Sequence, residues 1–554
     1  MTTQDRLPGQ PSDASGPDGS GPAEGSGPGT ATPPPGTAPS GAAPAERRWP
    51  WALAGLAAGV AGIGVAELAT VLSGPSSSPL VAVAQVFIDL TPPWLKDFAV
   101  STFGTHDKQV LLTGAGLVVA GLAVVIGLLA RRRPGPALGG VLTLGAVAVF
   151  AAVSRPDATV LSAVPGIAAA VTGAVVLGVL RDRGTRTAAG LRGAGDAPVT
   201  ARRELLMTSG VVAAGGLVAG LAGRALGTAA RGAETSRAQV ALPAPVGGTP
   251  VLPGGVEVGV PGVVPFRVPN ADFYRIDTAT VVPRVNTADW QLRIHGMVAR
   301  EVRLDWATLV AGGLVERDVT LTCVSNEVGD SLIGNARWLG LPLAPLLEQA
   351  GPTPDADMVL STSADGWTAG TPLAVLLDGR DAMLAIGMNG EPLPIEHGFP
   401  ARMVVPGLYG YVSATKWVVE LEVTRFDRAE GYWTPRGWSA KGPIKTESRI
   451  DVPRPGARVK AGQVAVAGIA WAQHRGIKGV QVRLDGGDWR DAQLGAEATV
   501  DTWRQWVYRW DAAPGHHKIA VRAVDGTGAV QTGDEAPPAP DGATGWHEIE
   551  VDVT

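Results

Sequence analysis

The chain has 554 residues, a formal net charge of −5 and a single cysteine. This length exceeds that of one ordinary domain, and the slightly acidic balance leaves no basic excess that would favour nucleic acid as a partner. One cysteine excludes an intrachain disulfide framework and a cysteine-rich metal cluster. The 75 glycines and 45 prolines are unevenly spread, and their distribution marks the predicted domain boundaries.

The first 46 residues consist mostly of glycine, proline, serine, alanine and threonine. Such a segment has little apolar surface to bury and cannot offset the entropy that is lost when a chain becomes ordered. We therefore expect residues 1–46 to be disordered. The character of the sequence changes at Arg47 and Arg48, where a predicted membrane section begins that extends to residue 230.

Five apolar stretches within residues 47–230 predict transmembrane helices. They are Trp51–Ser73, Gln109–Ala130, Ala137–Val153, Thr159–Leu180 and Leu205–Leu226. Most of them reach the roughly 20 residues that cross about 30 Å of hydrocarbon, and Ala137–Val153 is at the lower limit. Glu67 lies in the first stretch. An acid there is either functional or close enough to a helix end to reach water.

The arginines predict the orientation of the membrane section. With five crossings, the arginine clusters fall on one face, which the positive-inside rule makes cytoplasmic. These clusters are Arg47/Arg48, Arg131–Arg133, Arg181/Arg183 and Arg202/Arg203. An odd number of spans then places everything after Leu226 on the extracytoplasmic side of a bacterial cell membrane. Leu80–Phe103 is a sixth apolar candidate, but Pro92-Pro93, Lys96 and Asp97 interrupt it and indicate an extracytoplasmic or re-entrant segment.

The sequence TARRELLMTSG (Thr200–Gly210) places paired arginines directly before the fifth apolar stretch. Two interpretations stay open: an internal twin-arginine-like export signal, or two ordinary arginines that flank a transmembrane helix. The two leucines and the weakly hydrophobic, Gly/Ala-rich span support the first interpretation. An export signal of this kind implies a domain that crosses the membrane already folded, as is needed when a cofactor is inserted in the cytoplasm.

A Pro/Gly/Val-rich linker over residues 231–265 leads into a predicted α+β domain over residues 266–430. Trp290–Val298 alternates as a strand. Leu304–Gly312 has helical spacing with Asp305 as its N-cap. A further helix in LPLAPLLEQAG is closed by its final glycine, Gly351.

Residues 431–554 predict an all-β domain. Val480–Leu494 contains two alternating runs around Asp-Gly-Gly, which is a hairpin pattern. Further short strands follow at regular spacing and indicate an antiparallel sandwich of immunoglobulin type. The chain is therefore expected to be multi-domain: a helical membrane section, an α+β domain and an all-β sandwich.

The only cysteine, Cys323, comes at the end of a strand pattern in RDVTLTCVS. A lone thiol is either a small buried hydrophobic side chain or a thiolate that binds a metal or acts as a nucleophile. The neighbouring Ser325, Asn326 and Glu327 make a polar surrounding rather than a core. This favours the second interpretation.

The segment around Cys323 and a second segment further along the chain resemble those of a known family. LTCVSNEVG (Leu321–Gly329), followed by ARWLGLPLAPLLEQAG (Ala336–Gly351), resembles the cysteine segment of the sulfite oxidase family of molybdenum enzymes. MNGEPLPIEHGFPARMVVPGLYGYVSATKW (Met388–Trp417) is similar to the pterin- and phosphate-binding segment of that family, and the sandwich to its C-terminal dimerisation domain. The resemblance covers about residues 269–554. It implies molybdenum–molybdopterin, in which Cys323 and one pyranopterin dithiolene bind the metal.

The same resemblance implies which residues contact the cofactor. They are Asn270, Phe273, Tyr274, Cys323, Thr362, His397, Arg402, Ser413, Ala414, Thr415 and Lys416. An arginine such as Arg402 binds an anionic or carbonyl edge with two parallel hydrogen bonds. The small-residue turn from Ser413 to Lys416 ends in a cation and is expected to hold the terminal phosphate.

Around the substrate, the implied catalytic set of Cys323, Arg275, Trp367 and Arg337 departs from that of a sulfite oxidase. Trp367 stands where the family has a tyrosine, and Arg275 is the nearest match to one substrate arginine. Arg337 either supplies a second cation or pairs with a neighbouring acid, Glu327 or Asp330. A site with fewer cations binds a sulfite dianion less well, so we expect oxygen-atom transfer on a small sulfur oxyanion or on a sulfoxide.

Electrons must enter or leave through a partner. One cysteine and the lack of a CxxCH motif exclude an iron–sulfur cluster and haem c, and His106 is the only histidine near the spans. We therefore expect a separate electron-transfer protein or a quinone, a small-molecule substrate and a homodimer through the C-terminal domain. Two hypotheses of other classes stay open: a cofactor-free, membrane-tethered binding module on the same fold, and a transporter with an exported sensor domain.

Overall fold

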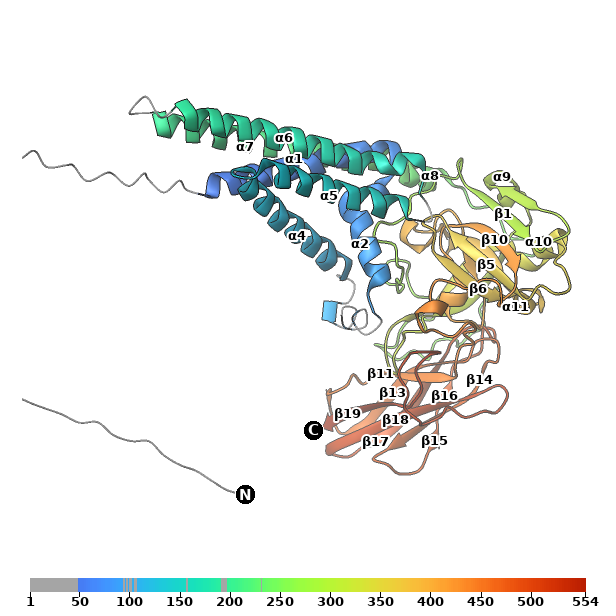
Figure 1. The fold of residues 1–554 in the computed structure, drawn as a ribbon. Helices are drawn as coiled ribbons and strands as arrows, with labels where there is room; N and C mark the ends of the chain where they lie inside the picture. Colours follow the sequence, from blue (N-terminus) through green and yellow to red (C-terminus); the bar gives the residue numbers. More distant parts are fainter. Residues whose placement is uncertain are drawn as a thin grey trace, which may run out of the picture. The chain divides into compact units, whose positions relative to one another are not determined.

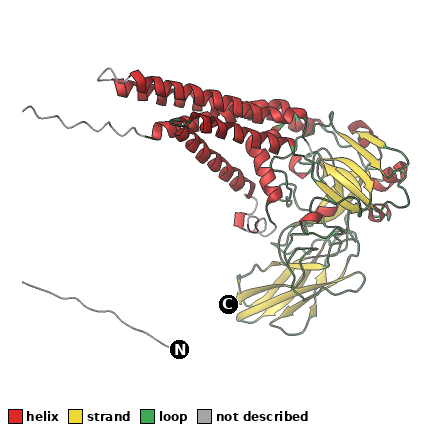
Figure 2. Ribbon diagram, viewed as in Figure 1, coloured by secondary structure: helices red, strands yellow, loops and turns green. Residues whose placement is uncertain are grey.

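The computed structural model describes residues 48–554, except for 93–94, 96–97, 99–101, 104–106, 156–157, 191–196 and 231. The tail predicted to be disordered, residues 1–46, and His106 lie outside the described residues. Helices make up the first part of the described chain and strands predominate in the second (Figures 1 and 2).

Among the residues that the structure describes, five helices are long and apolar enough to cross a membrane, by length and composition. They are α1 (Trp49–Ser73), α4 (Asp107–Ala130), α5 (Pro134–Val153), α6 (Val164–Gly190) and α7 (Ala197–Ala230). Each overlaps one of the five predicted stretches. Helix α5 has 20 residues and is longer than its predicted stretch, because the helix already begins at Pro134, a residue suited to a first turn. The paired arginines of TARRELLMTSG lie within α7.

The sixth apolar candidate begins with a short helix, α2 (Pro79–Leu90), of 12 residues. A helix of this length spans about 18 Å, which is less than the hydrocarbon core of a bilayer. Several residues of Leu80–Phe103, among them Pro93, Lys96 and Asp97, lie outside the described part of the chain, so the extracytoplasmic or re-entrant placement of this segment stays a prediction.

Helix α1 packs against α4, α6 and α7. Glycines allow the close approach to α7, since a Cβ at Gly64 would collide with the backbone of Gly216. The acid of this helix, Glu67, is buried and has partners on both oxygens. The Ser78 hydroxyl donates to Oε1 at 2.6 Å, and Nε of Arg224 lies 3.6 Å from Oε2.

The α+β part contains two sheets. The first has the order β2-β1-β10-β5-β6, and the second has the order β3-β4-β7-β8, with β9 paired to β7. The strands are β1 (Gln291–Gly296), β2 (Val302–Asp305), β3 (Val315–Thr322), β4 (Ile333–Pro342), β5 (Met358–Ser363), β6 (Thr368–Pro372), β7 (Met383–Met388), β8 (Glu391–Pro392), β9 (Arg402–Val404) and β10 (Val418–Thr424).

Three short helices accompany these sheets: α9 (Trp306–Ala311), α10 (Leu343–Ala350) and α11 (Leu373–Leu377). Both predicted helix signals are confirmed. The Thr308 backbone N–H donates to the Asp305 carboxylate at 2.8 Å, which caps α9. Gly351 ends α10 with φ 71°, a left-handed conformation that glycine adopts without steric cost.

The C-terminal part consists of two further sheets, with the orders β11-β13-β17-β16 and β12-β19-β18-β14-β15. Their strands are β11 (Glu447–Val452), β12 (Arg458–Val459), β13 (Gly462–Trp471), β14 (Ile477–Leu484), β15 (Arg490–Asp491), β16 (Gln493–Leu494), β17 (Arg504–Ala512), β18 (Gly515–Asp525) and β19 (His547–Val553). The predicted hairpin is present as the antiparallel pair β14–β15. Side chains from both sheets, including Val466, Trp506 and Val521, form one core. The immunoglobulin type of this sandwich stays a prediction.

The segment predicted as a linker contains helix α8 (Ala233–Gln239) and then runs along the β-rich part of the chain. The Val258 N–H donates to Gln505 Oε1 at 2.9 Å, and the Val264 N–H donates to Asp451 Oδ2 at 3.0 Å. Val256 is buried. The described residues 232–265 therefore contribute packing and hydrogen bonds and are more than a flexible tether.

Candidate functional site

The lone cysteine lies where strand β3 ends. Strand β3 closes at Thr322, and Cys323 opens a loop in which the Asn326 N–H donates to the Cys323 carbonyl at 3.1 Å. The Asn326 side chain accepts from the Leu332 N–H at 2.8 Å and so closes the loop. The thiol residue is 9% exposed, and burial raises the pKa of Cys323 although hydrogen bonds from Ser325 oppose this rise.

The segment 270–274 brings two aromatic residues, Phe273 and Tyr274, to the vicinity of this loop. The rings of Phe273 and Tyr274 are stacked with centroids 5.2 Å apart. Phe273 also meets Trp338 and His397 edge-on, at 5.8 and 5.6 Å. Burial raises the pKa of Tyr274 far above its ordinary value; the charge of Cys323 raises it further and that of Arg402 lowers it. Tyr274 is therefore close to both the thiol and the arginine.

Arg402, at the start of β9, is a buried cation that donates hydrogen bonds to neutral carbonyl groups. Its Nη1 donates to the His397 carbonyl at 3.1 Å, and its Cζ lies 5.0 Å from the centre of the Trp338 ring. No carboxylate forms an ion pair with it in the described part of the chain. Burial lowers the pKa of Arg402 to about 10. A buried guanidinium without a carboxylate is suited to an anionic ligand.

Lys416 brings a second buried cation into the same region. Its Nζ lies 2.8 Å from Asp277 Oδ2, donates to the Glu396 carbonyl at 3.1 Å and sits 4.5 Å from the centre of the Trp417 ring. Burial, only partly opposed by Asp277, lowers the pKa of Lys416 to about 8, and the charge of Arg402 lowers it further.

His397 adds a third basic group to the site, in neutral form. Its Nε2 lies 3.3 Å from the Asn270 carbonyl oxygen. Burial, followed by the charges of Arg402 and Lys416, lowers the pKa of His397 to about 4. Because the charge of Arg402 lowers the proton affinity of both Lys416 and His397, the site favours an anion that would offset this electrostatic repulsion.

The turn from Ser413 to Lys416, which is predicted to hold the terminal phosphate, is fixed by hydrogen bonds of its own hydroxyl groups. The Ser413 hydroxyl donates to the carbonyls of Leu408 and Tyr409, at 3.1 and 2.9 Å, and Thr415 Oγ1 lies 2.6 Å from Ser361 Oγ. Both hydroxyls are thus engaged inside the fold and shape the turn. The cation of Lys416 is the part of this turn that is suited to a phosphate.

Thr362 is on the other face of its strand. Side chains alternate along β5, so Ser361 and Ser363 face the turn while Thr362 lies opposite Glu420 of β10. The Ser363 hydroxyl is buried without a hydrogen-bond partner in the described structure. Ser361 and Ser363 are therefore better placed than Thr362 to serve the site, and the alternation of strand side chains is the signal that could have identified them.

Arg337 does not join the group around Cys323. Its guanidinium donates to the Pro250 carbonyl at 2.8 Å and lies 3.5 Å from Asp318 and 3.8 Å from Glu316. These partners replace the expected pairing with Glu327 or Asp330, because cross-strand pairing of β3 with β4 places Arg337 opposite Asp318. Its predicted role as a second substrate cation finds no support in this geometry.

Arg275 lies in the cationic region, and the connection that carries Trp367 borders it. Arg275 Nε donates to Asp277 Oδ2 at 2.9 Å, so it shares a carboxylate with Lys416. Trp367 belongs to the connection between β5 and β6. In the same connection, the Ala364 N–H donates a hydrogen bond to the Trp417 carbonyl at 2.8 Å. Asp277 itself was missed by sequence reasoning, because a single acid after FYRI carries no motif.

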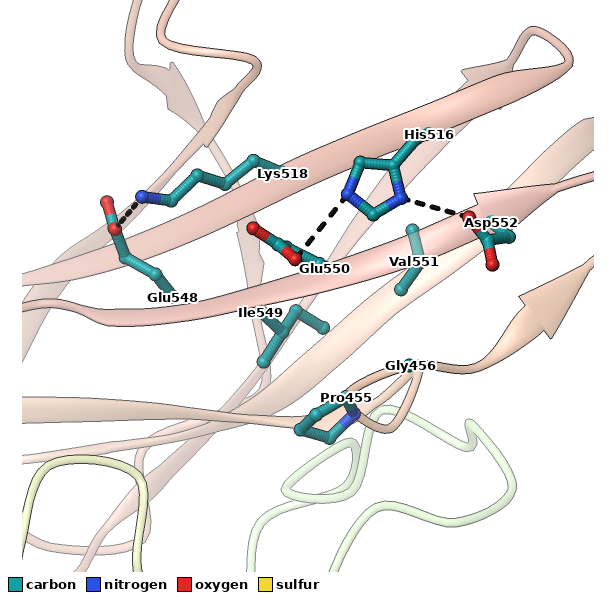
Figure 3. A pocket seen from close by; sticks show the side chains of 9 residues that line it. All are labelled: Pro455, Gly456, His516, Lys518, Glu548, Ile549, Glu550, Val551 and Asp552. Atoms are coloured by element: carbon teal, nitrogen blue, oxygen red, sulfur yellow. Dashed lines mark hydrogen bonds and ion pairs between the residues drawn. The ribbon is translucent and has the colours of Figure 1, made fainter. Parts of the chain in front are cut away.

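A groove of about 490 Å³ lies elsewhere, on β18 and β19 of the sandwich (Figure 3). It is lined by Pro455, Gly456, His516, Lys518, Glu548, Ile549, Glu550, Val551 and Asp552. Its charged groups are paired with one another: His516 Nδ1 lies 2.9 Å from Asp552, and Lys518 pairs with Glu548. The groove contains no residue of the predicted site.

The part of the chain that carries the candidate site is similar to known proteins. Residues 279–433 match the family model of the oxidoreductase molybdopterin binding domain. Mitochondrial sulfite oxidase of Drosophila melanogaster is 30% identical over 320 residues, which cover 48% of this chain and 55% of that protein. The sulfane dehydrogenase SoxCD from Paracoccus pantotrophus, a solved structure, is 25% identical with a TM-score of 0.46, over 53% of this chain and 82% of its own.

A shorter relative is matched over most of its length. The uncharacterized oxidoreductase YuiH of Bacillus subtilis is 31% identical over 180 residues, which are 32% of this chain and 87% of that protein. The chain spans only about half the length of the sulfite oxidases it matches. Together with the matched molybdopterin binding domain, these relatives establish that the chain belongs to the sulfite oxidase family of molybdopterin oxidoreductases.

Proposed function

We propose that this protein is a membrane-anchored, extracytoplasmic oxidoreductase that uses molybdenum–molybdopterin to transfer an oxygen atom to or from a small sulfur oxyanion or a sulfoxide. The observation that carries the proposal is the placement of Cys323 at the end of β3, with Tyr274 within electrostatic reach of both Cys323 and the buried cation Arg402. A soft thiolate and an unpaired guanidinium suit a metal–dithiolene group that is also anionic.

The residues of this chain have separate parts in the proposed site. Cys323 would hold molybdenum through Sγ, and Arg402, Lys416 and neutral His397 would bind the anionic and polar edges of the pterin. Phe273 and Tyr274, whose rings stack on each other, would form an aromatic wall of the cofactor site and limit the entry of water. When bound, the cofactor supplies two-electron redox chemistry with exchange of an oxygen atom.

The two arginines proposed for the substrate side of the site are already paired with carboxylates. Arg275 shares Asp277 with Lys416, and Arg337 is engaged by Asp318 and Glu316. A dianion would therefore meet fewer free cations than the number of arginines suggests. This supports a monoanionic or neutral sulfur compound, with sulfoxides included, over a sulfite dianion.

The membrane section is proposed to be an anchor that holds the catalytic half at the extracytoplasmic face. Five apolar helices of sufficient length support the anchor, and the arginine clusters support the sidedness. A separate electron-transfer protein or a quinone would exchange electrons with the site. The sandwich would mediate a homodimer.

The test is metal and pterin analysis of the full chain purified from cells that synthesise molybdopterin. We expect close to one molybdenum and one pterin for each chain. Cys323→Ser is expected to abolish turnover in a screen with sulfite and methionine sulfoxide, whereas Ser331→Ala, an exposed change in the same loop, should leave it intact. Full activity of Cys323→Ser would refute the proposal.

A matched preparation from cells that cannot make molybdopterin separates the enzyme from a cofactor-free binding module. The enzyme should lose activity in that host and regain it when the cofactor is restored. A protein that carries no molybdenum in either host would contradict the proposed function.

A further inference from the structure

A residue of the membrane section contacts the candidate site. Lys108, in the first turn of α4, places its Nζ 2.6 Å from Asp277 Oδ1, and it also donates to the Asp277 and Ala279 carbonyls at 2.8 and 2.9 Å. Three acceptors match the three N–H donors of an ammonium group. The contact joins residues that are 169 positions apart in the sequence.

Asp277 connects this lysine to the site. Its side chain is 5% exposed, and its other oxygen, Oδ2, lies 2.8 Å from Lys416 Nζ and 2.9 Å from Arg275 Nε. Although burial alone would raise the pKa of Asp277, the charges of Lys416, Lys108 and Arg275 hold it well below its ordinary value. The carboxylate thus stays ionised and fixes cations on both of its oxygens.

The position of Asp277 also affects the aromatic wall. Phe273 and Tyr274 precede it by only a few residues on the same irregular segment, which has no strand or helix between residues 240 and 290. A segment without regular hydrogen bonding depends on its side-chain contacts for its conformation. The Lys108 ammonium binds two carbonyls of this segment directly and therefore restrains it.

A second contact of the membrane section offers an internal control. Asp89, near the end of α2, accepts from the Tyr432 hydroxyl at 2.6 Å and lies 3.6 Å from Arg436 Nη2. This contact reaches the segment after β10 and involves none of the residues assigned to the cofactor. The two contacts can therefore be removed separately.

We propose that Lys108 is a positioning residue of the cofactor site: through Asp277 it fixes the ammonium of Lys416 and the segment that carries Phe273 and Tyr274. The membrane section is then a working part of the site as well as an anchor. This inference rests on the proposed function, because it assigns to Lys416 the binding of the anionic part of a molybdopterin. The physical reason is that a carboxylate with a cation on each oxygen has far less freedom than one bound on a single side.

The test compares Lys108→Met, Lys108→Arg and Asp89→Asn in the full chain. In Lys108→Met, we expect faster amide hydrogen exchange at residues 270–280 and 413–417, and a loss of bound molybdopterin on dilution that is about tenfold faster than in wild type. Lys108→Arg should restore both values in large part. Asp89→Asn should change exchange only around residues 430–436.

The outcomes separate this inference from the proposed function. The positioning role would be overturned if residues 413–417 of Lys108→Met exchanged amide hydrogens at the wild-type rate, or if this variant lost molybdopterin at the wild-type rate. The proposed function would stand in either case. Loss of cofactor in Asp89→Asn to the same extent would also overturn it, because the effect would then belong to docking in general. A wild-type chain without molybdopterin would refute the proposed function, and exchange alone would then report whether Lys108 orders the Lys416 segment.

Discussion

Glu447 is a carboxyl group buried between the sandwich and the loop of Cys323. It is 4% exposed, and burial raises its pKa to about 8 from an ordinary value of 4.5. Lys445, Asn326 and Trp471 oppose this rise without cancelling it. The folded chain therefore keeps this proton over a range of pH in which the unfolded chain has released it.

The sign of the pH dependence follows from this difference in bound protons. Between pH 4.5 and about 8 the folded state holds the proton and the unfolded state does not, so the free energy of unfolding falls as the pH rises. We predict that Glu447→Gln removes this slope and stabilises the protein at pH 8 by up to a few kcal/mol. Thermal unfolding of the detergent-solubilised chain at pH 5 and pH 8 measures it.

Glu497→Gln is a suitable control, because this half-exposed carboxylate near Arg504 is outside the buried group. It should keep the wild-type slope. Equal slopes in wild type and Glu447→Gln would show that the Glu447 carboxyl does not retain its proton on folding.

At the scale of elements, helix packing within the membrane section depends on single glycines. Gly216 of α7 faces α1, where an added Cβ would lie 2.7 Å from the Val60 carbonyl oxygen and from the Ala61 Cα. A Cβ added at its neighbour Gly215 would point into open space, with no heavy atom within 4 Å. The two positions differ by one residue and therefore have nearly the same depth along the helix.

We predict that Gly216→Val destabilises the helix bundle by about 2 kcal/mol, because the helices must separate to admit the side chain. Gly215→Val should have a much smaller effect. Thermal unfolding in detergent, followed by intrinsic fluorescence, compares the two. A Gly216→Val protein as stable as Gly215→Val would contradict close packing of α1 on α7.

The strand elements decide which face a residue presents. Strand β5 turns Ser361 and Ser363 toward the Thr415 turn, and a shift by one residue would have turned Thr362 there instead. In the same way, pairing of β3 with β4 directs Arg337 to Asp318. Element geometry therefore gives Thr362 and Arg337 surroundings that the motifs did not indicate, and the roles assigned to them stay predictions.

At the scale of the whole molecule, the contact of Lys108 bears on sidedness. Lys108 lies in the first turn of α4 and touches Asp277 of the catalytic part, whereas the other end of α4 leads into Arg131–Arg133. A helix of 24 residues separates its ends by about 36 Å. The catalytic part and this arginine cluster therefore belong to opposite ends of α4, in agreement with the proposed orientation.

We predict that a membrane-impermeant thiol reagent labels Lys460→Cys, but not Arg132→Cys, in intact spheroplasts when both changes are made in a Cys323→Ser background. Both positions are exposed, so accessibility depends only on the side of the membrane. After permeabilisation both should react. The reverse pattern would place the catalytic half in the cytoplasm, either because the five-span section is inverted or because a sixth span precedes Arg132.

Local features were determined by the sequence alone. The apolar lengths predicted all five long helices, Asp305 and Gly351 predicted their helix ends, and the position of Cys323 at a strand end followed from the pattern before it. These features depend on residues within one turn or one strand, so the spacing of apolar side chains and the capping residues are sufficient to predict them.

The tertiary structure alone decided which distant residues meet. Lys108 reaches Asp277, Ser361 reaches Thr415 and Arg337 is held by Asp318, across separations that no local pattern encodes. A single lysine or aspartate has the same appearance in a sequence whether it is solvated or buried in a site. Only the packing of the chain sets the distance between charges and removes the water between them, and these two quantities determine the electrostatics of the site.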